Sequence, residues 1–456
     1  MGDDWEELAG EEGEEVPSNR FGRMFKLGKM GARVGASSLA SRLKNFLPGD
    51  RDQRDADLSE AYSKNAEYMA KVFGELKGAS MKVGQLLSAD PELLPPEFSE
   101  QLASLQRDAP PMTYNTVRQQ IEDGLGRPIE SVFEHFDPDP VGSASIGQVH
   151  KARLDGGREV AIKVQYPGVV ESLESDLKSL KSMLVYGRAV VDRERLEEYF
   201  EEIREVLLLE ADYVNEAENL ERFHEILEDR DDLRAPKPYH QWTSKSVLVM
   251  EYIAGEKLDD ALGRMEPGDD RRQELLERWV GTYVWMFHEL FTLHADPHPG
   301  NFLLEDDGTL AMLDFGCVKD FDPDFADGIL EVLDCCWRDD QEGAIDVYER
   351  LGFGNDNAMY GDIDPDLLWE YHQIVLGPFL HDEPFEFGGW SPAMDGKKFM
   401  LKHPSFFQLV PPADALLYFR VLSGIKGLLN KLDARINLFP LAVETARRRG
   451  VLTADL

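Results

Sequence analysis

The stretch His294-Ala-Asp-Pro-His-Pro-Gly-Asn301, followed by Asp314-Phe315-Gly316, decides the fold of this 456-residue chain. Asp296 and Asn301 stand five positions apart, and Asp314 opens the second segment. Phosphoryl transfer suits this spacing, because one carboxylate accepts a proton or orients the attacking group while an amide and a second carboxylate hold Mg²⁺. The two segments therefore predict a Mg-ATP site, with Asp296 as the base and with Asn301 and Asp314 as metal ligands.

A kinase active site also needs a lysine on a strand and a glutamate on a helix that pairs with it. Val160-Ala161-Ile162-Lys163 reads as V-A-I-K within a run of β-branched residues, which favours a central strand and places Lys163 at the α- and β-phosphates. The segment 209–219 is helical in composition and offers Glu210 and Glu216 as ion-pair partners for this lysine. Glu216 is the favoured partner. Each motif alone is weak, but their joint order predicts a kinase-like fold.

The nucleotide itself needs a phosphate loop and a hinge. A loop of small residues precedes V-A-I-K, and its backbone N–H groups would approach phosphate; it consists of Gly142, Ser143, Ala144, Ser145 and Ile146. A plain turn between two strands is the alternative interpretation. The strand-like run 247–253 leads to the hinge between lobes, where the backbone of Glu251 and Ile253 would hydrogen-bond adenine.

Three further motifs carry a resemblance to a known family. Met81-Lys82-Val83-Gly84-Gln85 is similar to a K-x-G-Q signature, the run 143–150 resembles an alanine-rich nucleotide loop, and Glu210-Ala211-Asp212 matches E-x-D. With them the chain resembles the UbiB (AarF) family of atypical kinase-like proteins, from about Asp57 to Leu429. K-x-G-Q together with H-x-D-P-H-P-G-N is not found in ordinary protein kinases.

The resemblance implies an α+β, bilobal protein-kinase-like fold with an N-terminal helical K-x-G-Q extension over the place where a peptide substrate would lie. It implies ATP and Mg²⁺ as cofactors, and an ATPase or a small-molecule or lipid kinase in isoprenoid quinone or lipid metabolism. Its motif residues are Lys82, Gly84, Gln85, Glu210 and Asp212, and it implies that Lys82 and Gln85 reach toward the two acids, Glu210 and Asp212. Because this loop reads Gly142-Ser143-Ala144-Ser145, with glycine and serine where many members carry alanine, nucleotide preference or affinity is expected to differ from that of those members.

Four segments are predicted along the chain. Residues 1–50 form an acidic tail and a basic amphipathic segment, and residues 51–135 form the helical K-x-G-Q extension. Residues 136–256 form a kinase-like N-lobe, and residues 257–456 form a helical C-lobe. Within the C-lobe, short strands are expected at 302–304 and 311–313, on either side of the turn Asp306-Asp307-Gly308.

Charge excludes one class of partner. Lys and Arg total 49 against 87 Asp and Glu, which gives a net charge of −38 and argues against binding of nucleic acid. An acidic surface along the whole chain is typical of proteins that stay soluble in high salt, so a halophilic, archaeal source is favoured. Most of these carboxylates are expected on solvated faces.

Residues 17–49 are the exception, because they contain no Asp or Glu. This segment carries seven basic residues interleaved with Phe, Met and Leu, a pattern suited to an anionic lipid surface. Peripheral membrane association through this segment is one prediction; docking on the protein's own acidic body, or staying mobile, is the other. Three cysteines give no disulfide framework, and no transmembrane run or signal peptide is present, so a cytoplasmic location is expected, with possible contact to the inner face of the membrane.

Rival functions stay open. His294 and His298 stand four apart, as zinc ligands on a helix can, but the flanking prolines disfavour a helix and the glutamate of H-E-x-x-H is missing. His294 is more simply a packing residue and His298 a shaper of the turn. A protein serine/threonine kinase is disfavoured by K-x-G-Q and by the lack of A-P-E after Asp314. A nucleotide-binding scaffold without turnover is disfavoured by the intact base and metal ligands.

Overall fold

The structure is a computed structural model, which describes residues 112–144, 146–170, 173, 177, 201, 204–205, 207–354, 363–409, 411–412 and 415–456. The chain divides into two compact units. The first comprises Met1–Gly255 and Glu305–Cys317, and the second comprises Glu256–Leu304 and Val318–Leu456. Glu305–Cys317 falls within the range predicted for the C-lobe, yet it belongs to the first unit. Among the described helices, none combines the length and the apolar content that crossing a membrane requires.

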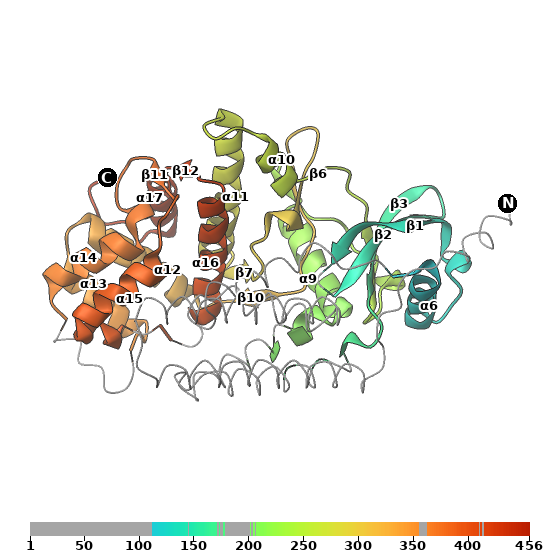
Figure 1. The fold of residues 1–456 in the computed structure, drawn as a ribbon, viewed down its shortest axis with the longest axis horizontal. Helices are drawn as coiled ribbons and strands as arrows, with labels where there is room; N and C mark the ends of the chain where they lie inside the picture. Colours follow the sequence, from blue (N-terminus) through green and yellow to red (C-terminus); the bar gives the residue numbers. More distant parts are fainter. Residues whose placement is uncertain are drawn as a thin grey trace, which may run out of the picture. The chain divides into compact units, whose positions relative to one another are not determined.

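An antiparallel sheet forms the centre of the first unit, with the order β1-β2-β3-β5 (Figure 1). Its strands are β1 (Phe133–Ala144), β2 (Gly147–Leu154), β3 (Arg158–Gln165) and β5 (Val247–Glu251). On β3, the β-branched residues Val160, Ile162 and Val164 are fully buried on one face. Since side chains alternate along a strand, Lys163 points to the opposite face, where Val149 of β2 and Leu248 of β5 are its strand neighbours.

Two helices of the first unit pack on this sheet. Helix α6 (Tyr114–Leu125) begins at Thr113, whose hydroxyl caps the Thr116 N–H, and ends at Gly126 in the left-handed conformation. It packs against β3 and β5. Helix α9 (Tyr213–Ile226) begins at Asp212, whose carboxylate accepts from the Val214 N–H, and packs against β5. The unit also contains η3 (Ile129–Ser131), η4 (His240–Trp242) and β4 (Leu233–Arg234), which pairs in parallel with β9 (Leu310–Met312).

The second unit begins with short strands around a long helix. Strand β6 (Glu256–Lys257) pairs with β8 (Phe302–Leu304), and β7 (Thr292–His294) pairs with β10 (Val318–Asp320), both antiparallel. Helix α10 (Leu258–Arg264) and helix α11 (Asp270–His288) lie between β6 and β7 in sequence, and η5 (Pro299–Asn301) precedes β8. These elements place the predicted catalytic loop between β7 and η5.

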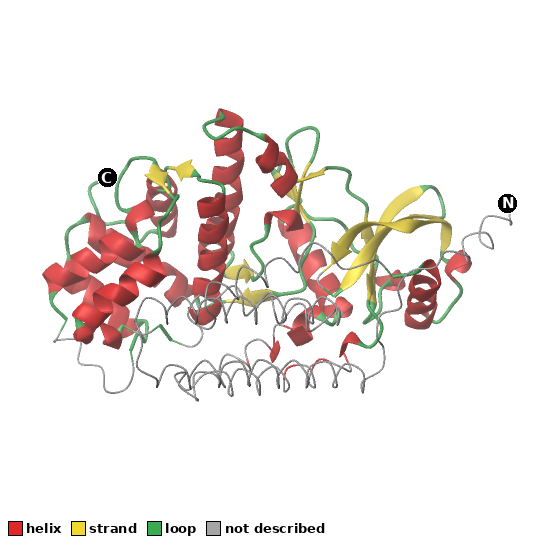
Figure 2. Ribbon diagram, viewed as in Figure 1, coloured by secondary structure: helices red, strands yellow, loops and turns green. Residues whose placement is uncertain are grey.

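Helices dominate the rest of the second unit (Figure 2). In chain order its elements are α12 (Pro323–Trp337), α13 (Gln341–Arg350), α14 (Pro365–Val375), η7 (Gly377–Phe379), β11 (Phe385–Glu386), α15 (Pro392–Lys402), η8 (Pro404–Gln408), α16 (Leu416–Lys431), β12 (Arg435–Ile436) and α17 (Phe439–Arg449). Several helices begin at an aspartate that caps the first turn, such as Asp322 of α12 and Asp364 of α14, each followed by proline. Their apolar faces form one core that includes Leu330, Phe399 and Phe406.

The predicted short strands are present with small shifts. Strand β8 has the predicted bounds 302–304, while β9 covers 310–312 where 311–313 is predicted. Gly308 between them has φ +94°, a conformation that favours glycine. The three-residue strands β7 and β10 are not predicted from the sequence. They matter because β7 leads directly into the catalytic loop.

Candidate active site

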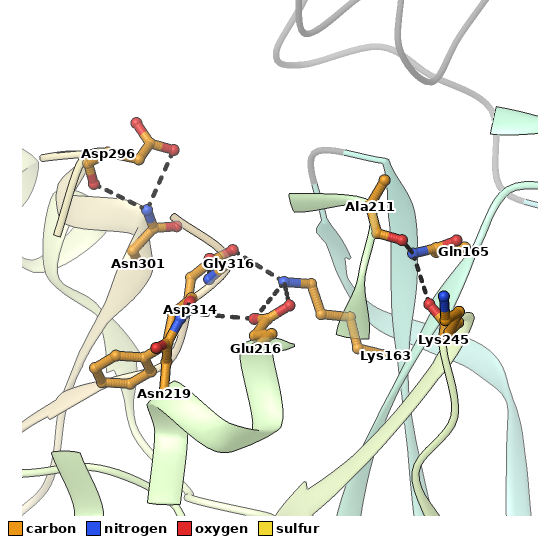
Figure 3. Close-up of polar contacts among 11 residues, drawn as sticks. Lys163, Gln165, Ala211, Glu216, Asn219, Lys245, Asp296, Asn301, Asp314 and Gly316 are labelled. Atoms are coloured by element: carbon orange, nitrogen blue, oxygen red, sulfur yellow. Dashed lines mark hydrogen bonds and ion pairs between the residues drawn. The ribbon is translucent and has the colours of Figure 1, made fainter. Parts of the chain in front are cut away.

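Lys163 of the V-A-I-K motif lies at the centre of a buried ionic network in the first unit (Figure 3). Its side chain is nearly inaccessible, with 6% of the residue exposed. The ammonium Nζ donates to Glu216 Oε1 at 2.7 Å and Oε2 at 2.9 Å, and to Asp314 Oδ2 at 3.0 Å. The sequence predicts Glu216 over Glu210 as the partner of Lys163, and the structure brings Lys163 and Glu216 into contact.

Burial and charge act against each other in this network. Burial raises the pKa of Glu216 to about 7, although Lys163 opposes the shift by favouring the carboxylate. Burial alone would lower the pKa of Lys163, but Asp314 and Glu216 together raise it well above its ordinary value. The lysine therefore keeps its charge, because two carboxyl groups compensate for its loss of solvent.

One face of α9 holds the backbone of the D-F-G segment. Glu216 Oε1 accepts from the Phe315 N–H at 3.4 Å, and Asn219 Nδ2 donates to the Phe315 carbonyl at 3.1 Å (Figure 3). The Phe315 ring is fully buried against Phe223, with 4.8 Å between ring centroids. Asp314 Oδ1 in turn accepts from the Gly316 N–H at 3.0 Å. Glu216, Asn219 and Phe223 are spaced i, i+3 and i+7, so they share one side of the helix.

The sequence interpretation missed Asn219 and Phe223. Their spacing after Glu216 is the only signal in the sequence that could have indicated them. Gln165 was missed too: its Nε2 donates to the carbonyls of Ala211 at 2.8 Å and Lys245 at 3.1 Å (Figure 3). It therefore ties β3 to the residues that precede α9 and β5.

Tyr213, the first residue of α9, covers the lysine from another side. The Lys163 Nζ lies 5.1 Å from the centre of the Tyr213 ring, within range of a cation–π interaction. The Tyr213 hydroxyl is buried and has no hydrogen-bond partner among the described residues. It lies 3.0 Å from the point that a Cβ on Gly147 would occupy, at the start of β2.

The predicted nucleotide loop is a tight hairpin. Gly142, Ser143 and Ala144 end β1, where Gly142 pairs with Val149 and Ala144 pairs with Gly147. Ile146 is buried, and its carbonyl accepts from the Tyr166 N–H at 2.9 Å. Ser145 lies outside the described residues.

Gly147, which sequence interpretation did not select, is the residue that the backbone requires here. A Cβ at this position would lie 2.2 Å from the Val164 carbonyl oxygen. Only glycine lets β2 approach β3 this closely.

The E-x-D residues lie beside the same network. Glu210 is buried, and its Cγ lies 3.4 Å from the point that a Cβ on Gly316 would occupy. Asp212 caps α9, and its Oδ2 lies 3.8 Å from Lys245 Nζ. Lys82, Gly84 and Gln85, which are expected to face these acids, lie outside the described residues.

At the end of β5, the predicted hinge residues differ in their contacts. The Glu251 carboxylate accepts from Arg234 Nη2 at 2.6 Å, and the Glu251 N–H donates to the Lys237 carbonyl at 2.8 Å. The Tyr252 N–H donates to the Glu159 carbonyl at 3.3 Å. Ile253 is buried, and its N–H has no hydrogen-bond partner within the described part of the chain.

In the second unit, the catalytic loop is organised by its own residues. His294 is buried at the end of β7, and its Nδ1 accepts from the Asp296 N–H at 3.3 Å. Asn301 Nδ2 donates to the Asp296 carbonyl at 3.2 Å and to its carboxylate Oδ2 at 3.4 Å (Figure 3). The predicted base and the predicted amide ligand are therefore held against each other.

The Pro-His-Pro-Gly turn has its own supports. His298 Nδ1 accepts from the Gly300 N–H at 3.0 Å and so caps η5, while the His298 N–H donates to the Asp296 carbonyl at 2.7 Å. Pro297 packs on α16, where a Cβ on Gly424 would lie 2.6 Å from Pro297 Cγ. Both histidines thus bind backbone N–H groups of the loop. Within the described ranges, no group of three or more His, Cys, Asp and Glu side chains is arranged to hold a metal ion.

Comparison with known proteins identifies the family. A profile of the ABC1 atypical kinase-like domain matches residues 104–348, more than half of the chain. The chain belongs to the ABC1 atypical kinase-like family. This match covers Lys163, Glu216, Asp296, Asn301 and Asp314, and it confirms the resemblance to UbiB and AarF proteins seen in the motifs.

Two ABC1 relatives and one solved structure extend this result. The chain is 28% identical to the probable serine/threonine-protein kinase abkA of Dictyostelium discoideum, over 93% of the chain and 79% of the relative. It is 29% identical to the mitochondrial atypical kinase coq-8 of Caenorhabditis elegans, over 92% of the chain but only 56% of that relative. A structure of Rv3197 from Mycobacterium tuberculosis in complex with erythromycin is 27% identical, with a TM-score of 0.60 over 87% of the chain and 98% of that protein. The α+β, protein-kinase-like fold predicted from the sequence is therefore confirmed.

Proposed function

We propose that this ABC1 protein binds Mg-ATP and either hydrolyses it or transfers its γ-phosphoryl group to a small molecule or lipid, in isoprenoid quinone or lipid metabolism at a membrane surface. The observation that carries the proposal is the contact of Lys163 with both Glu216 and Asp314. Kinase-type phosphoryl transfer needs this lysine to be charged and fixed, because catalysis depends on positioning and electrostatics. The likeness to the atypical kinase coq-8 supports the proposal.

ATP would lie against the sheet of the first unit. At Gly147 the start of β2 approaches Val164, the residue that follows Lys163 on β3. A phosphate-binding turn at the β1–β2 hairpin needs such a close approach of backbone. The Ile253 N–H has no partner in the described residues, so it remains to donate to the adenine ring, and the Glu251 carbonyl would accept from it. The roles of Gly142, Ser143, Ala144, Ser145 and Ile146 in holding the phosphates belong to this proposal.

The donor set fits Mg²⁺. Asn301 donates through Nδ2 to Asp296, so its amide Oδ1 faces away from these bonds and remains as a hard oxygen ligand. Asp314 provides a carboxylate that Lys163 and the Gly316 N–H already orient. When bound, Mg²⁺ neutralises charge on the β- and γ-phosphates. Asp296, fixed by Asn301 and by His294, would orient the attacking hydroxyl or water and accept its proton.

A second candidate is protein serine/threonine kinase activity, which the likeness to abkA favours. The two candidates differ in where the phosphate goes. With added protein substrates, a protein kinase transfers label to serine or threonine, whereas the favoured activity releases phosphate or labels a small acceptor. A scaffold without turnover gives neither product.

The test is Mg-dependent ATP hydrolysis by the full chain in high salt, with and without anionic liposomes. We expect Lys163→Met, Asp296→Asn and Asp314→Asn each to lower the rate by about 10²-fold or more, because each removes a charge that acts on the transferring group. Asp306→Asn is the matched control, since Asp306 is exposed in the turn before β9. The proposal would be refuted if the Asp314→Asn variant hydrolysed ATP as fast as the wild type, or if the wild type showed no Mg-dependent turnover under any condition.

A further inference from the structure

Apart from its catalytic loop, the second unit has an acid-poor stretch that includes an exposed helix face. Residues 387–432 contain two acidic residues, Asp395 and Asp414, and six basic ones, although acids make up 87 of the 456 residues of the chain. At that average, about nine acids would be expected here. The stretch includes α15, and the burial of its side chains shows which face of the helix packs on the protein.

Helix α15 is anchored by one face. Gly396 and Phe399 are buried, Gly396 lies against Tyr371 and Val375 of α14, and the Phe399 ring lies 5.7 Å from that of Tyr371. Phe399 and Tyr371 belong to the hydrophobic core of the second unit, in which α14 and α15 are neighbours (Figure 1). Since these contacts fix the rotation of the helix about its axis, the residues on the other face cannot turn inward.

The other face of α15 exposes large apolar side chains. Met394 is 55% exposed and Leu401 is 65% exposed, the two highest values among the large hydrophobic residues that the structure describes. They stand seven positions apart, so they point to the same side of the helix two turns from each other. Exposed lysines surround them: Lys397 and Lys398 lie between the two, and Lys402 follows.

The charge on this face is mostly uncompensated. Lys398 pairs with Asp395 at 3.0 Å, but both groups are exposed, so the pair is weak. Lys397 and Lys402 form no ion pair with any residue in the described ranges. A chain with a net charge of −38 is repelled by an anionic surface over most of its area, which makes this face a local exception.

We propose that the face of α15 formed by Met394, Lys397, Lys398, Leu401 and Lys402 docks on an anionic lipid surface. The two apolar side chains enter the interface, and the lysines extend their apolar stems and place their amines among the headgroups. A protein partner fits less well, because protein interfaces are depleted in lysine, which supplies three of the five residues of this face. Of the residues enriched at such interfaces (aromatic residues, Met and Arg), only Met394 lies on it. The proposed function places the protein at a membrane surface, and this proposal names the residues that contact the membrane. It rests on the membrane location in the proposed function and not on ATP hydrolysis.

The test is a local probe of insertion in the full-length protein. Met394→Cys is labelled with bimane, since Cys317, Cys335 and Cys336 are buried and react poorly. With phosphatidylglycerol vesicles containing brominated lipid, we expect quenching at position 394 but not at Glu342→Cys, an exposed position on α13. Phosphatidylcholine vesicles should abolish the quenching, and a rising salt concentration should weaken it.

Vesicle partition measures the charge contribution. The triple variant Lys397→Gln, Lys398→Gln, Lys402→Gln should bind phosphatidylglycerol vesicles at least about tenfold more weakly than the wild type. Each lysine near the membrane surface contributes electrostatic attraction to the anionic lipid. Lys237→Gln, Lys257→Gln, Lys431→Gln makes the same change of charge at other exposed positions and should bind as the wild type does.

Three results would overturn the proposal. The first is vesicle binding without quenching at 394, which assigns the membrane contact to another segment such as 17–49. The second is no binding at all. The third is burial of the 394 label by a second copy of the chain or by an acidic polypeptide, with no effect of vesicles. Because no nucleotide is added, and Lys163→Met should bind vesicles normally, these results are distinguishable from a failure of the ATPase proposal.

Discussion

Asn219 on α9 and Phe315 of the D-F-G segment are joined by a hydrogen bond of 3.1 Å from the side-chain amide to the backbone carbonyl. Glu216, one turn earlier, accepts from the N–H of the same Phe315. The helix that fixes Lys163 therefore also fixes the backbone next to Asp314, the expected metal ligand. Helix, lysine and D-F-G segment should respond together when one contact is removed.

We expect Asn219→Leu to lower both stability and turnover. The substitution removes the side-chain amide that donates to the part-buried Phe315 carbonyl, and the loss of such a bond costs about 1–3 kcal/mol. Turnover should fall more than ATP affinity, because Asp314 is displaced from the phosphates. Thermal unfolding and the separate effects on kcat and KM check this. Asn215→Leu, the same change one turn earlier on α9, is the control; equal losses in both variants would show a general effect on the helix.

The Glu216 pKa predicts how activity depends on pH. Below its pKa of about 7 the carboxyl group is protonated and cannot pair fully with Lys163, so ATPase activity should fall as the pH drops below about 7. Glu216→Gln should be slow at every pH and should lack this acidic limb. Glu218→Gln, an exposed neighbour, should keep it. Parallel pH profiles for wild type and Glu216→Gln would show that another group controls the limb.

The same shift has the opposite consequence for stability. The folded state binds the Glu216 proton more tightly than the unfolded chain does, because the pKa of Glu216 is about 7 in the folded state and 4.5 in the unfolded chain. Tighter proton binding by the folded state adds to the free energy of unfolding. This addition is fully present below pH 4.5 and is lost as the pH rises through about 7. Glu216→Gln should remove it, so the difference in Tm between variant and wild type should shift in favour of the variant as the pH rises. A constant difference would contradict the raised pKa.

Gly147 and Gly142 make a matched pair for the nucleotide hairpin. A Cβ on Gly147 would meet the Val164 carbonyl at 2.2 Å, whereas a Cβ on Gly142 would meet no atom within 4 Å. Gly147→Ala should therefore cost about 1–3 kcal/mol of stability and weaken ATP binding, because β2 must move away from β3. Gly142→Ala should change stability by less than about 0.5 kcal/mol. Calorimetric titration with ATP and thermal unfolding measure both; similar behaviour of the two variants would rule out the close approach.

Much of this arrangement could be predicted from the sequence, for identifiable reasons. Lys163 and Glu216 were predictable because V-A-I-K marks the strand lysine of a kinase-like site, and the ion-pair partner of that lysine is a glutamate on the following helix. Strand β8 was predictable because the Asp306-Asp307-Gly308 turn follows it. The membership of Glu305–Cys317 in the first unit was not, since chain order does not encode which residues pack together.

Other features leave no pattern to read. Strands β7 and β10 have three residues each, too few for an alternation to show. Asn219 and Gln165 donate hydrogen bonds to backbone carbonyls. Every residue has a backbone carbonyl, so the sequence does not show which carbonyl the fold brings to each amide. The requirement for glycine at 147 arises only after β3 is in place, from the Val164 carbonyl.

His298 allows a test of how the unusual catalytic turn works. Its Nδ1 caps the Gly300 N–H, and this turn carries Asn301 to Asp296. His298→Ala removes the acceptor and should cost about 0.5–2 kcal/mol, with a larger loss in turnover because Asn301 is no longer held. His298→Asn retains a side-chain oxygen that can cap the same N–H and should restore most of both.

A zinc role for His298 predicts a different result. If this histidine and His294 held zinc, asparagine would not rescue the variant, and a zinc-selective chelator would inactivate the wild type in the presence of Mg²⁺. We expect the chelator to have no effect, while removal of Mg²⁺ abolishes turnover. Rescue by His298→Asn together with resistance to the chelator would establish the residue as a cap whose function is to position Asn301.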